Sequence, residues 1–264
     1  MMKRFFAIAL FVLGLGQLYA QPVRDTAWTK AGYFGLKLTQ VSLSSWSAGG
    51  ESALAFDSQI TYSADFKRDR QLWQNRLELG YGLTKNDGKS ARKTNDKIYF
   101  ASTYGYQIYK TLYWSALLNF NTQFAKGYDY NIEDSDFISK FMAPGYLMIG
   151  TGVTWSPNKI FTATFTPASW RGTIVADSRL SDEGAFGVDK GKHLLSEFGA
   201  NLKAEVNYEF LPNMKVYSRL ELYSNYLEDP QNVDVRWEVQ LNMAINKWFS
   251  TTLSTNLLYD NDVK

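Results

Sequence analysis

The chain has 264 residues, of which 45% are apolar and 16% aromatic, with no cysteine and a formal net charge of +2. This apolar and aromatic content excludes an intrinsically disordered chain, because it can bury enough surface to form one domain or a small pair. The missing cysteine excludes a disulfide-stapled scaffold and a thiolate metal site, and after residue 20 no run of ~20 apolar residues supports a helical membrane protein.

The first twenty residues have the pattern of a cleaved export signal. Lys3 and Arg4 precede an apolar stretch over residues 5–15, which is too short for a membrane anchor. Ala20 provides the small residue before a cleavage site. Removing Lys3 and Arg4 from the 28 basic residues leaves 26, which equals the 26 acidic residues. The mature chain is therefore neutral, and no nucleic-acid partner is expected.

Apolar and polar residues alternate along most of the mature chain, which is typical of β-strands with one apolar face. The clearest case runs from Val233 to Ile245, where apolar residues alternate with Asp234, Arg236 and Glu238 and then with amides. Most of the predicted strands reach the ~9–11 residues of a tilted membrane-spanning strand. The pattern predicts eleven strands, at 33–43, 54–66, 71–83, 97–109, 112–124, 146–155, 160–167, 201–210, 215–226, 233–245 and 248–259.

Such strands suit either a soluble secreted barrel that holds an apolar ligand inside, or an outer-membrane barrel with its apolar face outward. Aromatic residues recur at the strand ends, as in the aromatic girdles of membrane barrels. The connections also alternate in length. They are short after every even-numbered strand and long after the third, fifth and seventh, at 84–96, 125–145 and 168–196. This asymmetry favours an outer-membrane barrel with tight periplasmic turns and a periplasmic N-terminus.

Bacterial single-chain barrels usually have an even number of strands. Eleven predicted strands, followed by the polar segment 260–264, therefore indicate a C-terminally truncated chain that lacks a twelfth strand. A ten-stranded barrel with different pairing is the alternative. We expect a cleaved signal at 1–20, a periplasmic segment at 21–32 and, over 33–264, an all-β, antiparallel up-and-down transmembrane β-barrel of about 12 strands in the complete protein.

Three short segments carry a resemblance to a known family. They are Trp46 to Ser52 (Trp-Ser-Ala-Gly-Gly-Glu-Ser), 173–175, and Gly184 to Val188 (Gly-Ala-Phe-Gly-Val) followed by Gly191 and Lys192. Together they resemble a family of uncharacterised Bacteroidota outer-membrane proteins that is named only as a domain of unknown function. The resemblance implies an outer-membrane barrel that continues past an Asp-rich segment into a final strand with a terminal aromatic residue. It implies no activity.

A basic residue and a glutamate recur two positions apart on the polar face of several strands, at Arg76 and Glu78, Lys203 and Glu205, Arg219 and Glu221, and Arg236 and Glu238. Three of these pairs lie on consecutive predicted strands, so opposite charges can pair across the sheet inside the lumen. Such a network can fill and rigidify a narrow barrel, or form a polar constriction that selects solutes. A wide channel is disfavoured, because twelve strands fall below the 16–18 of open porins.

Little in the sequence supports catalysis, a metal or a cofactor. His193 is the single histidine and lies in the longest predicted loop, near Ser178, Ser181 and Ser196, where a solvated side chain is the simpler interpretation of a Ser/His/acid pattern. The acids Asp129, Glu133, Asp134 and Asp136 suit a solvated loop better than a hard cation. The segment 184–191 lacks the strand-turn-helix context of a phosphate loop.

Basic residues cluster in one predicted outward loop, at Lys85, Lys89, Arg92 and Lys93. They suit a solvated loop or contact with anionic lipid headgroups. The sequence predicts a non-enzymatic outer-membrane barrel that passes a small solute through a narrow charged lumen, with outer-membrane lipid and other outer-membrane proteins as partners. A structural or scaffold barrel in an outer-membrane assembly is the alternative, and a soluble secreted ligand-binding barrel is a third.

Overall fold

The structure is a computed structural model that describes residues 27–43, 50–132, 136–246 and 249–259. The predicted signal at 1–20, residues 21–26 of the segment at 21–32, the motif residues 46–49 and the polar segment 260–264 lie outside the described residues. In the described part of the chain, no helix is both long and apolar enough to span a membrane.

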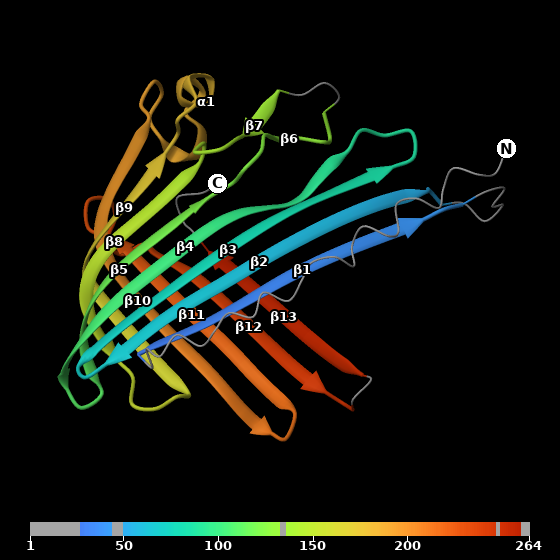
Figure 1. Ribbon diagram of the computed structural model, residues 1–264. Coiled ribbons are helices and arrows are strands. Elements are labelled where there is room, and N and C mark those ends of the chain that lie inside the picture. The colour runs from blue at the N-terminus through green and yellow to red at the C-terminus, as the bar shows by residue number, and fades with distance from the viewer. Residues whose placement is uncertain (1–26, 44–49, 133–135, 247–248, 260–264) are drawn as a thin grey trace.

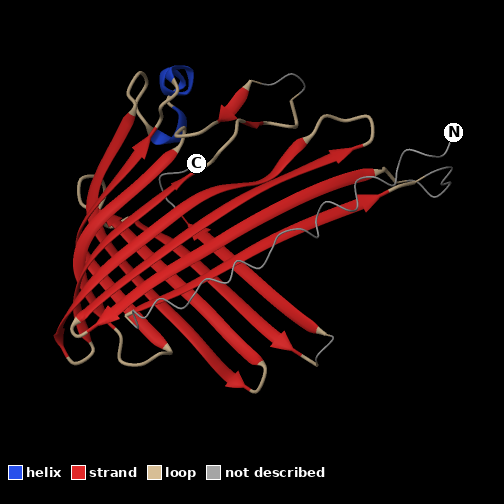
Figure 2. Cartoon of the chain, viewed as in Figure 1, coloured by secondary structure: helices blue, strands red, loops and turns tan. Residues whose placement is uncertain are grey.

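Eleven long strands form one antiparallel sheet in which neighbours in sequence are neighbours in space, with order β1-β2-β3-β4-β5-β8-β9-β10-β11-β12-β13 (Figures 1 and 2). The predicted all-β class and eleven antiparallel strands are therefore confirmed. The strands are β1 (Trp28–Val41), β2 (Ala53–Arg68), β3 (Gln71–Asn86), β4 (Arg92–Tyr109), β5 (Leu112–Thr122), β8 (Gly145–Trp155), β9 (Phe161–Ile174), β10 (Leu194–Leu211), β11 (Met214–Asn225), β12 (Val233–Ala244) and β13 (Ser250–Tyr259).

The sheet is strongly curled rather than flat. In Figure 1, β1 to β4 cross in front of β11 to β13, so the two ends of the sheet form facing walls. β1 and β13 are its edge strands, and within the described residues they are not paired with each other. The curl follows from the right-handed twist that accumulates over long antiparallel strands.

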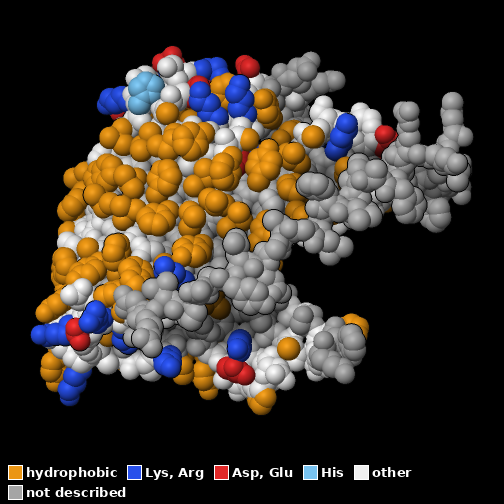
Figure 3. Space-filling view, in the orientation of Figure 1, with side chains coloured by type: hydrophobic (Ala, Val, Ile, Leu, Met, Phe, Trp, Pro, Cys, Tyr) orange, Lys and Arg blue, Asp and Glu red, His pale blue; other side chains and the backbone are white. Residues whose placement is uncertain are grey.

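The two faces of the sheet differ sharply in chemistry. One row of directly opposed residues reads Phe34, Ile60, Leu79 and Ile98 across β1 to β4. These side chains are on the outer face, where Phe34 is 65% exposed, and apolar groups cover the flank seen in Figure 3 between ends that carry the charged groups. Because side chains alternate along a strand, the residues between them face the inside.

Four strand ends differ from the prediction by five residues or more. β1 begins at Trp28, inside the segment 21–32 predicted to precede the barrel, and β4 begins at Arg92. β9 continues past Pro167 to Ile174, and β10 begins at Leu194, so the predicted loop 168–196 shortens to residues 175–193. The pairing of β9 with β10 shifts register between Gly199 and Asn201, and this irregularity accommodates the proline, which has no N–H for the ladder.

The loops at one end of the sheet contain small elements that the alternation does not predict. They are β6 (Gly127–Tyr128) and β7 (Phe137–Ser139), which pair, the helix α1 (Ser178–Glu183), and the 3-10 turn η1 (Ala185–Gly187). Asp177 caps α1 by accepting a hydrogen bond from the Leu180 amide, and Gly184 ends it with a φ of 75°. Four buried apolar residues hold these loops together: Ala143, Val175, Leu180 and Val188.

Candidate functional site: the charged inner face

The inner face of β10, β11 and β12 carries six of the eight predicted lumen charges in a checkerboard. Lys203 stands opposite Glu221, and Glu205 stands opposite Arg219, across β10 and β11. Arg219 in turn faces Glu238, and Glu221 faces Arg236, across β11 and β12. Every cross-strand neighbour in this block thus has the opposite charge, an arrangement that favours this register over a slipped one.

Arg219 is the centre of this block. Its Nε donates to Oε1 of Glu205 at 3.0 Å, and its Nη1 lies 3.7 Å from Oε2 of Glu238. The hydroxyl of Tyr217 donates to the same Glu205 oxygen at 3.1 Å, and Lys203 Nζ lies 3.5 Å from Oε2. Glu205 therefore has partners at both oxygens, which offsets the cost of holding a half-buried carboxylate.

The outer members of the block are less constrained. Glu221 accepts a hydrogen bond of 3.2 Å from the Asn201 amide. Arg236 is exposed on the inner face and, within the described residues, no carboxylate lies within 4.0 Å of it. Arg236 and Glu221 are thus the members of the checkerboard that make no ion pair among the described residues.

The other two predicted charges, Arg76 and Glu78, lie on the inner face of β3. Arg76 Nε donates to Oε1 of Glu78 at 2.5 Å, and Lys97 of β4 donates to Oε2 at 2.6 Å. Lys97 was not predicted as a site residue. The Lys97 contact depends on the pairing of β3 with β4, in which Lys97 stands opposite Gly80.

Tyr99 links the two groups of charges across the inside. It lies beside Glu78 in the pairing of β3 with β4, and it interacts electrostatically both with Arg76 and Glu78 and with Arg219 and Glu221. The charges of β3 and β4 therefore face those of β11 over the interior, as the crossing of the walls in Figure 1 also indicates. The inner face is thus polar at this level.

A second ionic cluster, which the prediction missed, lies nearer the long-loop end. Arg171 of β9 binds Glu197 of β10 through two hydrogen bonds of 2.8 and 2.5 Å, and binds Asp234 of β12 at 2.9 Å. Its guanidinium also stacks on the Tyr223 ring, 4.1 Å from the centroid. The alternation of Trp170, Arg171 and Gly172 is a weak signal for this strand, and the sequence prediction ends the strand at Pro167.

The histidine and serines of the predicted loop 168–196 make hydrogen bonds that hold the loop and the adjoining strands together. His193 Nδ1 lies 2.7 Å from the Val175 carbonyl oxygen, Ser181 Oγ donates to the Lys192 carbonyl, and Ser196 Oγ accepts from the Trp170 indole. Within the described residues, which leave out Glu133 and Asp134, no group of three or more acids and histidines could hold a metal ion.

The basic residues of the predicted loop 84–96 form ion pairs with nearby carboxylates. Lys89 Nζ lies 2.8 Å from Glu51 Oε1, and this contact, with a hydrogen bond from Asn86, holds the pKa of Glu51 below its ordinary value. Lys93 pairs with Asp96 at 2.7 Å, and the Arg92 guanidinium stacks on Tyr130. Two of the four basic groups are therefore neutralised by carboxylates.

Two family models match this chain. Both are described only as proteins of unknown function: DUF3078 matches residues 38–128 and DUF481 matches residues 170–264. Each match covers about a third of the chain, the first from the end of β1 to β6 and the second from within β9 onward. These matches agree with the expected resemblance to uncharacterised families. No curated protein matches the chain.

Proposed function

We propose that this protein is an integral outer-membrane β-barrel whose narrow, charged lumen passes a small solute. The observation that carries the proposal is that the apolar face of the sheet points outward and the charged face points inward, the reverse of a soluble barrel. Apolar residues such as Phe34 and Leu38 point outward and are 65% and 68% exposed, whereas the charged residues point inward. Exposed apolar surface on this scale is costly in water and favourable in a bilayer.

The same observation opposes a soluble ligand-binding barrel, which needs its apolar side chains inside. In the described part of the chain, the buried apolar cluster consists of four loop-end residues, while the interior of the sheet carries ionic networks. Charged groups therefore line the described interior where a soluble ligand-binding barrel would place apolar side chains. The proposed partner of the outer face is therefore outer-membrane lipid.

We further propose that the sheet closes into a twelve-stranded barrel. Strand direction alternates along the sheet, so β13, the eleventh strand in order, runs parallel to β1. One additional strand between them would be antiparallel to both and would pair all the edge groups, which lipid leaves unsatisfied at several kcal/mol each. The even total also suits bacterial barrels.

The orientation follows from the two ends of the sheet. The short connections at 69–70, 110–111 and 212–213 lie at one end, and the loops that carry β6, β7 and α1 lie at the other (Figure 1). Outer-membrane barrels place short turns in the periplasm and long loops outside. The export signal expected at 1–20 and a periplasmic N-terminus agree with this orientation.

Planar-bilayer conductance of the full-length protein tests permeation. We expect small steps, because twelve strands enclose little space and the charges of β3 and β11 face each other inside. Replacing two of the inner basic residues (Arg76→Gln with Arg219→Gln) leaves the carboxylates in excess, so selectivity should move toward cations. A folded protein that stays silent at all voltages would sink the permeation proposal.

A second candidate, a scaffold barrel in an outer-membrane assembly, is favoured by the mutual neutralisation of the inner charges. Arg219 lies between Glu205 and Glu238, and Arg171 lies between Glu197 and Asp234, so these groups satisfy one another without a solute. This function predicts an outer-membrane protein that co-purifies in mild detergent. Isolation as a clean monomer would count against it.

A further inference from the structure

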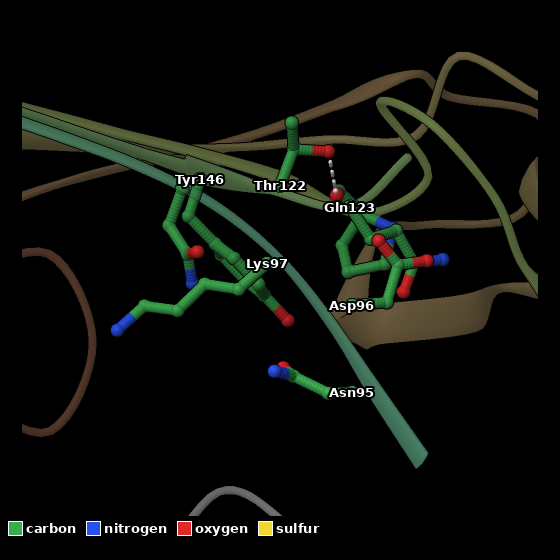
Figure 4. A pocket seen from close by; sticks show the side chains of 8 residues that line it. Asn95, Asp96, Lys97, Thr122, Gln123 and Tyr146 are labelled. Carbon is green, nitrogen blue, oxygen red and sulfur yellow. Dashed lines mark hydrogen bonds between the residues drawn. The ribbon is translucent and has the colours of Figure 1, made fainter. Parts of the chain in front are cut away.

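A polar pocket of about 350 Å³ lies on the inner wall near the long-loop end, where β4, β5 and β8 meet (Figure 4). Its volume falls within the range of small-molecule sites. Lys97, Tyr146 and Asn95 extend into the same space, and Asp96 and Gln123 lie together on its other side (Figure 4). The pocket is lined by Asn95, Asp96, Lys97, Asn121, Thr122, Gln123, Pro144 and Tyr146.

The two charged residues of this pocket both bind groups of opposite charge. Asp96 accepts hydrogen bonds from the amides of Phe124 and Ala125 at 2.7 and 3.0 Å, and pairs with Lys93 at 2.7 Å. Lys97 donates to Glu78 at 2.6 Å. Each charged side chain in the pocket thus already has a partner of opposite charge, so the groups left to bind a solute are the neutral amides.

Two amide side chains of the pocket lack partners. The Gln123 Nε2 atom is buried without a hydrogen bond, whereas the Asn121 amide, which makes none within the described residues, is exposed in the pocket. A buried donor without a partner costs free energy, and a ligand that accepts its hydrogen bond recovers that cost. The Gln123 amide therefore offers a buried donor, and the Asn121 amide an exposed donor and acceptor, to a polar, uncharged group.

An aromatic ring completes the site. Tyr146 stands directly opposite Asn121 in the pairing of β5 with β8, and its side chain is 40% exposed on the inner wall. Its flat face suits the C–H face of a sugar ring, while the amides suit hydroxyl groups. This mixture of one apolar surface and a few polar groups is characteristic of small-molecule sites.

We propose that this pocket binds an uncharged, hydroxyl-rich solute of monosaccharide size at the outer mouth of the barrel. The proposal rests on the proposed permeation function, for which the pocket is the first binding step. It assigns the solute to the neutral sugars and polyols rather than to ions or phosphorylated compounds.

Saturation-transfer NMR on the full-length protein in detergent tests the proposal, with D-glucose and D-galactose as neutral probes and glucose 6-phosphate as the charged one. We expect saturable binding of at least one neutral sugar below about 100 mM, a range suited to a transient permeation site. Asn121→Ala should weaken this binding about fivefold, the effect of one hydrogen bond. Asn119→Ala, on the same face two residues earlier, should leave it unchanged.

A second variant separates binding from folding. Gln123→Leu removes the unpartnered amide, so it should raise the midpoint of thermal unfolding while weakening sugar binding about fivefold. The absence of saturable binding by either neutral sugar would overturn the proposal, as would tighter binding of glucose 6-phosphate or equal losses in Asn119→Ala and Asn121→Ala. Sugar binding by a protein without conductance supports the pocket and overturns permeation, whereas conductance without sugar binding overturns the pocket alone.

Discussion

Arg219 on β11 stands directly opposite Glu205 on β10, and its Nε lies 3.0 Å from Oε1 of that carboxylate. The guanidinium also faces Glu238 of β12, at 3.7 Å. One cation therefore serves two carboxylates on the two neighbouring strands, and all three side chains are between a quarter and two-fifths exposed. Its loss would leave two like charges facing each other across the gap it fills.

Replacing this cation should destabilise the protein more than replacing an exposed one. We expect Arg219→Gln to lower the free energy of unfolding by about 1–3 kcal/mol, below the cost of breaking a fully buried pair because the site is partly solvated. The double change Arg219→Gln with Glu205→Gln should recover part of the loss. Urea unfolding in lipid vesicles, followed by tryptophan fluorescence, measures both values.

Lys215→Gln provides the matched control. Lys215 and Glu209 also stand opposite each other on β11 and β10, but their side chains are 60% and 50% exposed and their closest atoms are 3.4 Å apart. Exposed pairs contribute about 0–1 kcal/mol, so this variant should change little. An equal loss in Lys215→Gln and Arg219→Gln would contradict the central role of Arg219.

A charge on the outer face should be costly if that face meets lipid. Leu79 lies in the middle of β3 between Ile60 and Ile98, and Leu79→Arg at the bilayer midplane should cost about 2–4 kcal/mol. Thr61→Arg places the same charge on the inner face of β2, opposite Glu78, where it should cost far less. Folding yield into vesicles and urea unfolding compare the two variants. Similar costs would indicate that Leu79 does not face lipid.

The fold was predictable because period-two alternation is a local signal. Each strand of the large sheet presents one chemistry to each side, so Val233 to Ala244 can be recognised without knowledge of its neighbours. The opposed charges of Lys203 and Glu221 were likewise predictable, because hairpins with short turns fix the register from sequence spacing. A short turn thus allows the facing residues of two adjacent strands to be predicted from their spacing in the sequence.

The rest of the site depends on irregularities that spacing does not reveal. Arg171 meets Glu197 only because β9 continues past Pro167 and the pairing shifts register beside Gly199. Lys97 binds Glu78 from a position opposite Gly80, and that position is set by the register shift of the β3–β4 pairing beside Gly82. The helix α1 has a capping Asp177 and a final Gly184, but six residues are too few to show a helical period.

Acidification should release the cap of α1 before it unfolds the sheet. The ammonium of Lys140 and the amide of Leu180 hold the pKa of Asp177 below its ordinary value. Because the folded pKa lies below the unfolded value of about 3.9, this contribution to stability is present above about pH 4 and is lost as the pH falls through the folded pKa. The protection of the amides of residues 178–183, after correction for intrinsic exchange, should therefore fall as the pH drops below about 4.

Asp177→Asn distinguishes the charge from the hydrogen bond. Asparagine caps helices about as well as aspartate, so the Leu180 contact should persist while the pairing with Lys140 is lost. Protection in this variant should be lower at neutral pH and independent of pH below it, after correction for intrinsic exchange. An unchanged acid dependence would show that another group controls the loop.

The mode of closure can be decided with engineered cysteines, because the chain has none of its own. A disulfide needs Cα atoms within about 7 Å, and opposed residues of adjacent strands lie about 4.5–5.5 Å apart. Phe34→Cys with Ile60→Cys, opposite each other on β1 and β2, should therefore cross-link on oxidation as the positive control. If a further strand separates β13 from β1, Phe34→Cys should not cross-link to cysteine at Leu253, Thr255 or Leu257, because two strand spacings of about 4.8 Å separate the backbones. Efficient cross-linking of any of these three pairs would show instead that β1 and β13 pair directly as parallel strands.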